Sequence, residues 1–210
     1  MHRQREAIRV IVLLATVLLA GAGSSPTQGA TESQGRLSFR VRVSETGLQS
    51  RYLAQGKKLT DTVGTTLPGR LFDPPFRVAA TGRRAAHWDT PIHAAASDFS
   101  AFKSDDRTWI LENFIPEERS AVLSFLNDPA LHEKNRKVFE GRMERYITGE
   151  ATYKEYALVF VRDTGQNSSL PFTFKHTPTG WKRTNQLAAD EILDIVFSAL
   201  ANGGEVTVQP

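Results

Sequence analysis

Apolar and polar residues alternate along residues 36–44, and this period of two predicts a half-buried β-strand. Residues 45–75 are rich in Gly, Thr, Ser and Pro and show little periodicity. Asp73, followed by two prolines, predicts a break before a short strand at 76–80. We therefore expect residues 31–86 to form a β-rich extension or a small subdomain.

The spacing of apolar residues changes to that of helices from residue 87 onward. Thr90 followed by Pro91 is typical of a helix start, because Thr caps a helix and Pro fits its first position. Between residues 90 and 141, apolar residues three and four apart predict four helices. They are expected to begin at Thr90, at Ser104 or Asp105, at Pro116 and at Asp128, and the fourth to end at Gly141.

After Gly141 the period returns to two. It predicts strands at 143–148, 150–162, 170–176 and 181–186, followed by a helix at 187–200. Residues 157–161 are apolar on both faces, which is typical of an interior strand covered on both sides. The helices supply one cover. The N-terminal segment or a second copy of the chain, in a homodimer through the sheet, would supply the other.

A run of helices followed by an antiparallel meander predicts an α+β fold, with helices packed on a curved antiparallel sheet and an N-terminal β-rich extension. The expected divisions are a signal peptide at 1–30, the extension at 31–86, an α+β domain at 87–202 and a tail at 203–210.

The first residues have the pattern of a secretory leader. Three arginines within residues 1–9 precede an apolar core of thirteen residues at 10–22, which ends in the small residues Ala20, Gly21 and Ala22. A helix of thirteen residues spans about 20 Å, short of the hydrocarbon layer of about 30 Å. This favours a cleaved signal peptide over a retained anchor, and an exported protein with no membrane span after signal removal.

The composition restricts the chemistry and the compartment. The chain has no cysteine, which excludes disulfides and thiolate chemistry and fits a bacterial periplasm or exterior. Residues 31–86 carry a balance of +6 and residues 87–210 a balance of −5, within a net charge of +3. Such asymmetry indicates either an anionic partner or two surfaces that attract each other. Because no basic stripe is interleaved with aromatic residues, nucleic acid is not an expected partner.

Four stretches carry a resemblance to a known family. They are Thr90-Pro91 with Phe99 and Phe102; residues 105–114 with a Trp and a Phe; residues 153–162; and residues 172–185 with Gly180-Trp181-Lys182-Arg183. Through them, residues 90–186 resemble the nuclear-transport-factor-2-like superfamily. The resemblance implies a cystatin-like curved sheet around a long helix, with a pocket between them. This superfamily includes dehydratases, isomerases and cyclases as well as binding modules, so the fold does not settle the function. Because no motif of one enzyme family is present, no catalytic residue is carried over.

The densest polar cluster contains His87, Asp89 and His93, and His176 lies at the end of an apolar strand face. Histidine is the natural acid or base near neutral pH, and a carboxylate can orient it. Asp89 is equally explained as a helix-start residue. Helical geometry places His93 and Asp98 away from the buried stripe of the first helix, or at best along its edge. The spacing is not that of metal ligands, so no metal site is expected.

Tyr146, Tyr153 and Tyr156 are candidates to line a ligand pocket, although aromatic residues on strands also form cross-strand pairs. Without a convergent ionisable set, we expect an exported, non-catalytic envelope protein that uses no cofactor. It would bind a protein, a glycan or a small apolar ligand through a sheet/helix pocket. The alternative is a cofactor-independent acid/base enzyme, of dehydratase, isomerase or cyclase type, acting on a small hydrophobic substrate.

Overall fold

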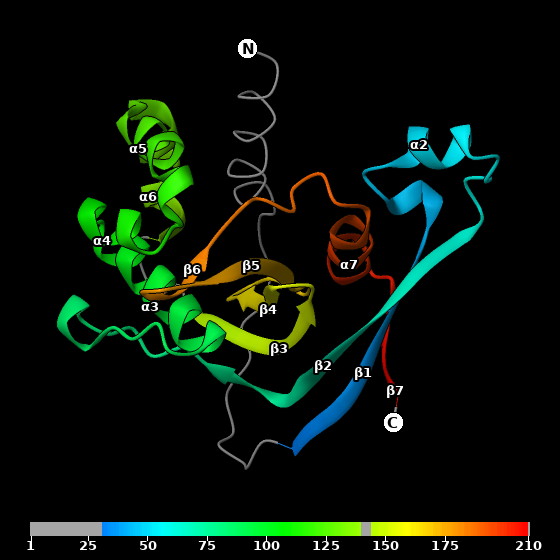
Figure 1. Cartoon of the computed structure of the whole chain (residues 1–210), viewed down its shortest axis with the longest axis horizontal. Helices are drawn as coiled ribbons and strands as arrows, with labels where there is room; N and C mark the ends of the chain where they lie inside the picture. Colours follow the sequence, from blue (N-terminus) through cyan, green and yellow to red (C-terminus); the bar gives the residue numbers. More distant parts are fainter. Residues whose placement is uncertain (1–30, 140–143, 210) are drawn as a thin grey trace.

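The computed structural model describes residues 31–139 and 144–209, in which seven strands form one antiparallel sheet (Figure 1). Their order is β6-β5-β4-β3-β2-β1-β7, so the first six strands follow one another across the sheet and β7 pairs with the outer edge of β1. The strands are β1 (Thr31–Arg42), β2 (Thr62–Arg77), β3 (Arg145–Tyr153), β4 (Tyr156–Asp163), β5 (Leu170–Thr177), β6 (Gly180–Arg183) and β7 (Glu205–Gln209).

The α-helices lie in three places along the chain. The α-helices are α2 (Gln49–Ala54), α3 (Pro91–Ser104), α4 (Arg107–Glu112), α5 (Arg119–Asn127), α6 (Pro129–Phe139) and α7 (Glu191–Ala201). Helix α2 connects β1 and β2, helices α3–α6 connect β2 and β3, and α7 precedes β7. The α+β class, with helices packed on an antiparallel sheet and a β-rich N-terminal part, is confirmed.

The N-terminal strands extend the main sheet. Strand β1 pairs with β2 along its whole length, and β2 then pairs with β3 from Gly69 onward. The expectation of an aperiodic segment up to residue 75 followed by a short strand was wrong, because β2 runs through both. The two prolines after Asp73 lie where the β2–β3 register shifts and the pairing with β1 has ended. Their missing N–H groups therefore cost no ladder hydrogen bond.

The strand expected at 150–162 is in fact the hairpin of β3 and β4. Tyr153 pairs with Tyr156, and the turn between them places Lys154 in the left-handed region with φ of 55°. The turn was missed because Lys154-Glu155 contains neither Gly nor Pro. Arg145 begins β3, and residue 143 of the strand expected at 143–148 lies outside the described residues, as does Gly141.

Strand β4 is covered on both faces, as its sequence predicts. Leu158 and Phe160 belong to the apolar cluster that contains α7, whereas Val159 and Val161 belong to the cluster that contains α3. In Figure 1, α7 lies on the sheet between β4–β5 and the β1–β2 ribbon. The second cover is therefore a helix of the same chain, which packs together with the apolar face of β1.

The helix starts follow local capping chemistry. The Thr90 hydroxyl accepts a hydrogen bond from the His93 N–H at 3.1 Å, which confirms the predicted start of α3. The next helix begins one residue later than expected, since Asp106 caps α4 and Asp105 ends α3 with φ of 53°. Pro116 opens a short 3-10 turn, and α5 begins only after it.

The C-terminal segment expected to be a tail contains β7. Residues Arg36–Arg40 of β1 pair with it, and Val206 and Val208 pack against the α7 cluster. The alternation of Val206 and Val208 with polar residues is the signal for this strand.

Opposite charges of the two chain segments meet in the folded protein. The ion pairs that join them are Arg51–Glu191, Arg70–Glu150, Arg77–Glu144 and Arg83–Glu112. This is the arrangement expected if the charge asymmetry reflects two surfaces that attract each other. Within the part of the chain that the structure describes, none of the helices has the length and apolar character needed to cross a membrane.

Candidate functional site

The layer between α3 and the sheet is filled with apolar side chains. Phe99 of α3 packs there with Phe172 and Phe174 of β5, and all three are buried. Ala94 and Ala95 bring the helix close to the sheet, because small side chains permit a close approach. The centre of the helix/sheet layer is therefore core.

A pocket of about 440 Å³ opens at one end of this layer. It lies where β2 ends, beside the second half of α3 and just before β3 begins. Its lining residues are Arg77, Val78, Ala79, Ala80, Phe99, Lys103 and Glu144. The volume falls within the range of roughly 300–1,000 Å³ typical of small-molecule sites.

The pocket combines an apolar surface with charged groups. The guanidinium of Arg77 lies 2.7 Å from the carboxylate of Glu144, which also accepts a hydrogen bond from the Tyr146 hydroxyl at 2.7 Å. This hydrogen bond, followed by partial burial, raises the pKa of Tyr146. The Lys103 ammonium lies 5.6 Å from the Phe99 ring centroid. Two of the three charged lining residues are cations, and one is an anion.

A buried ion pair contacts the apolar residues that line the pocket. The guanidinium of Arg145 lies 5.1 Å from the Phe99 ring centroid and donates to both carboxylate oxygens of Asp163, at 2.7 and 3.0 Å. The Val78 N–H donates to the Arg145 carbonyl at 2.8 Å, which ties the pocket segment after β2 to β3. Phe99 and Val78 are therefore held in place by contacts outside the pocket.

Sequence reasoning did not assign Arg77, Lys103 or Glu144 to a site. They come from three segments that are far apart in the chain and form no local motif. The only sequence signal was position, since Arg77 and Glu144 flank the long helical insertion between two strands.

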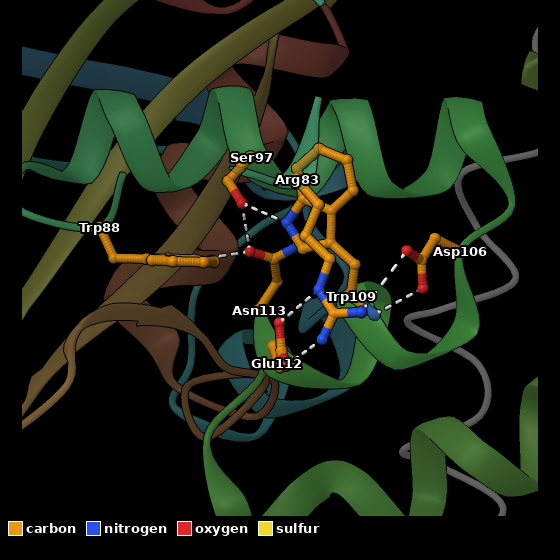
Figure 2. Close-up of polar contacts among 7 residues, drawn as sticks. All are labelled: Arg83, Trp88, Ser97, Asp106, Trp109, Glu112 and Asn113. Atoms are coloured by element: carbon orange, nitrogen blue, oxygen red, sulfur yellow. Dashed lines mark hydrogen bonds and ion pairs between the residues drawn. The ribbon is translucent and has the colours of Figure 1, made fainter. Parts of the chain in front are cut away.

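A polar network supports the opposite side of α3 (Figure 2). The side-chain oxygen of Asn113 accepts hydrogen bonds from the Trp88 indole and the Ser97 hydroxyl, both at 2.7 Å, and Ser97 in turn accepts from the Trp109 indole at 2.9 Å. Figure 2 also shows Arg83 reaching toward Asp106 and Glu112 of the α4 region. These bonds attach the segment before α3 to α4.

Asp98 is buried, contrary to its expected position away from the buried stripe of α3. Its carboxylate accepts a hydrogen bond from Arg183 of β6 at 2.8 Å, so the charge is paired. The expectation failed because α3 contacts β6 and α4 as well as the sheet centre, so its apolar stripe is only part of its buried surface. His93 does point outward, with 53% of its side chain exposed.

The structure brings three of the candidate residues together. The Nδ1 atom of His93 lies 2.8 Å from the carboxylate of Asp89, and the His87 and His93 ring centroids are 6.2 Å apart. The hydrogen bond to His93 is the largest cause of the lowered pKa of Asp89. All three residues are exposed, and none of them lines the pocket.

The other candidates lie elsewhere. His176 packs edge-on against Trp181, its partner across the β5–β6 hairpin. The hydroxyls of Tyr153 and Tyr156 bond to Asp190 and Gln186, so these tyrosines join the sheet to the segment before α7. Tyr146 lies at the other end of β3, beside Glu144.

Two further observations concern metal binding and a buried lysine. Within residues 31–139 and 144–209, no three His, Asp or Glu side chains are grouped closely enough to hold a metal ion. Lys182 is buried, with its ammonium 4.0 Å from the Trp88 ring centroid. Burial, followed by the nearby charge of Arg119, lowers the pKa of Lys182 to about 8.

No protein-family model, curated protein or solved structure matches this chain.

Proposed function

We propose that this chain is an exported, non-catalytic binding protein of the nuclear-transport-factor-2-like type, and that it holds a small apolar ligand bearing an anionic group. The observation that carries the proposal is the pocket at the end of α3, where Ala79 and Ala80 supply apolar surface beside Arg77 and Lys103. Four of the seven lining residues are apolar and three are charged, a more polar composition than that of most ligand pockets, and this favours a ligand that itself carries a charge.

The charges favour a carboxylate or a similar anion over a neutral ligand. Arg77 is paired with Glu144, and the Lys103 ammonium lies over the Phe99 ring. A ligand anion would approach these two cations, with its apolar part along Ala79 and Ala80. A hydrogen bond to a charged group contributes about 1.5–3 kcal/mol when it is shielded from water.

The pocket proposal is tested by calorimetric titration with decanoate, which joins one carboxylate to a saturated chain. We expect saturable binding to the wild-type chain, weakened about tenfold or more by Lys103→Met. Ala80→Trp, which fills the pocket from its rim, is expected to abolish binding. Arg84→Met is the matched control, because Arg84 is exposed and does not line the pocket. Equal loss in the control and in Lys103→Met would refute the pocket as the binding site.

The second candidate function is the cofactor-independent acid/base enzyme, and the hydrogen-bonded pair of His93 and Asp89 favours it. A carboxylate that orients an imidazole is a common arrangement for a general base. This candidate predicts that His93→Ala abolishes an activity while decanoate binding is unchanged. The binding function predicts that His93→Ala leaves both ligand affinity and biological function intact.

A further inference from the structure

The connection between β1 and β2 exposes apolar and basic side chains together. This ribbon tip (residues 49–61) contains α2 and lies at the far end of the β1–β2 ribbon from α3–α6 (Figure 1). Leu53 and Leu59 are 47% and 45% exposed, and they are two of the three large hydrophobic residues that stand out from the described surface. Both belong to a segment that also carries Arg51, Lys57 and Lys58.

The ribbon tip is held firmly against α7. Arg51 forms an ion pair with Glu191 at 3.1 Å, and the Gly47 N–H just before the tip donates to Asp194 at 3.0 Å. Tyr52 is buried beneath α2 and belongs to the α7 cluster. Because successive residues of a helix point about 100° apart, burial of Tyr52 turns Leu53 outward. The exposure of Leu53 therefore follows from the burial of Tyr52.

The charge of the tip is only partly compensated. Arg51 is paired with Glu191, and Lys57 and Lys58 face one acidic residue, Asp61, whose carboxylate accepts a hydrogen bond from the backbone N–H of Lys58 at 2.8 Å. Within the described residues, the ammonium groups of Lys57 and Lys58 take part in no ion pair. A basic surface with protruding leucines complements an anionic bilayer, whose headgroups attract the cations while the boundary below them accepts apolar side chains.

The size of the tip favours a bilayer over a protein partner. A stable protein interface buries about 800 Å² on each side, with shape complementarity around a central cluster. The end of a two-stranded ribbon with two separate leucines provides no such face, whereas shallow insertion into a bilayer needs no complementary shape.

We propose that the ribbon tip docks on an anionic lipid surface, with Leu53 and Leu59 inserted at the headgroup boundary and Lys57 and Lys58 against the lipid charges. Each lysine is expected to strengthen binding about fivefold. Each leucine is also expected to contribute about fivefold, since roughly half of its side chain is already withdrawn from water.

The experiment is vesicle flotation with the chain that begins at Thr31, so that the apolar residues 10–22 do not contribute. Every strand and helix of the described structure, with its core clusters, lies within this chain. We expect binding to vesicles of phosphatidylcholine and phosphatidylglycerol, little binding to phosphatidylcholine alone, and weaker binding at high salt.

Four variants locate the contact. Lys57→Ala/Lys58→Ala and Leu53→Ser/Leu59→Ser are each expected to weaken binding about 25-fold, from two fivefold contributions. Leu123→Ser and Lys134→Ala are the controls, because Leu123 is 41% exposed on α5 and Lys134 is exposed on α6. All four variants should retain the wild-type melting temperature, which verifies folding. Failure of the wild-type chain to bind anionic vesicles, or equal weakening by the control variants, overturns the proposal.

Discussion

The buried ion pair behind the pocket allows a sharp test of how this core is held together. Asp163→Asn removes the negative charge next to Arg145 while keeping the size of the side chain. The two side chains are 11% and 2% exposed, so the guanidinium would remain in the core without a counter-ion. Breaking such a pair by removing one partner typically costs 3–5 kcal/mol of unfolding free energy. The rings of Phe99 and Phe172, 5.1 and 4.9 Å from the guanidinium, offset a part of this cost, so we expect about 3 kcal/mol.

Urea unfolding measures the change, and Glu133→Gln is the matched control. Glu133 accepts two hydrogen bonds from Arg136, both at 2.9 Å, which is nearly the same geometry as that of the buried pair. Its side chain and that of Arg136 are 45% and 44% exposed, so the control should cost no more than about 1 kcal/mol. If the two variants lost the same stability, burial would not be what gives the pair its importance, and the reasoning would be refuted.

Two further predictions concern stability. The fold lowers the pKa of Lys182 to about 8 from its ordinary value of 10.5, so the unfolded chain binds the proton more tightly. The stability of the wild-type protein should therefore rise from about pH 8 to about pH 10.5. The free energy of unfolding should rise by at most about 3 kcal/mol, and the contact with the Trp88 ring reduces this value. Lys182→Met should be more stable than wild type at pH 7, and its stability should not rise over this pH range. A flat wild-type profile over that range would contradict the burial of a charged lysine. Gly149→Ala should destabilise by about 1–3 kcal/mol, because a Cβ atom there would lie 2.6 Å from the Arg70 carbonyl, whereas Gly82→Ala, with open space around it, should change little. Thermal unfolding of the two glycine variants side by side checks this, and equal melting temperatures would speak against the close approach of β2 and β3.

The sequence predicted the local elements well where apolar spacing and capping agree. Thr90 with Pro91 marked the start of α3, and the apolar run of β4 correctly indicated cover on both faces. Both signals depend on neighbours within a few residues, which is the range over which such patterns are reliable.

Long-range pairing was beyond these patterns. Strand β2 has no clean alternation, because its buried residues are Val63, Leu67 and Phe72 rather than every second residue, and Pro74 and Pro75 lie at the register shift. Lys154 forms a turn without a turn residue, since the pairing of Tyr153 with Tyr156 imposes it. These elements form because of their pairing with other strands of the sheet, and not because of their local sequence.

The candidate site shows the same limit. His87, Asp89 and His93 are close in sequence and close in space, so their proximity could be predicted, but their exposure depended on how α3 packs. The pocket residues Arg77, Lys103 and Glu144 meet only after β2, α3 and β3 have assembled. Asp98 was misplaced because its partner, Arg183, lies 85 positions away in the sequence.

The central claim is that the end of the α3–sheet layer binds an anionic apolar ligand. It is tested most directly by recording amide chemical shifts of the isotope-labelled protein during titration with decanoate. We predict shifts centred on Val78, Ala79 and Lys103 that saturate together. Shifts centred on His87 and His93, with the pocket amides unchanged, would contradict the account.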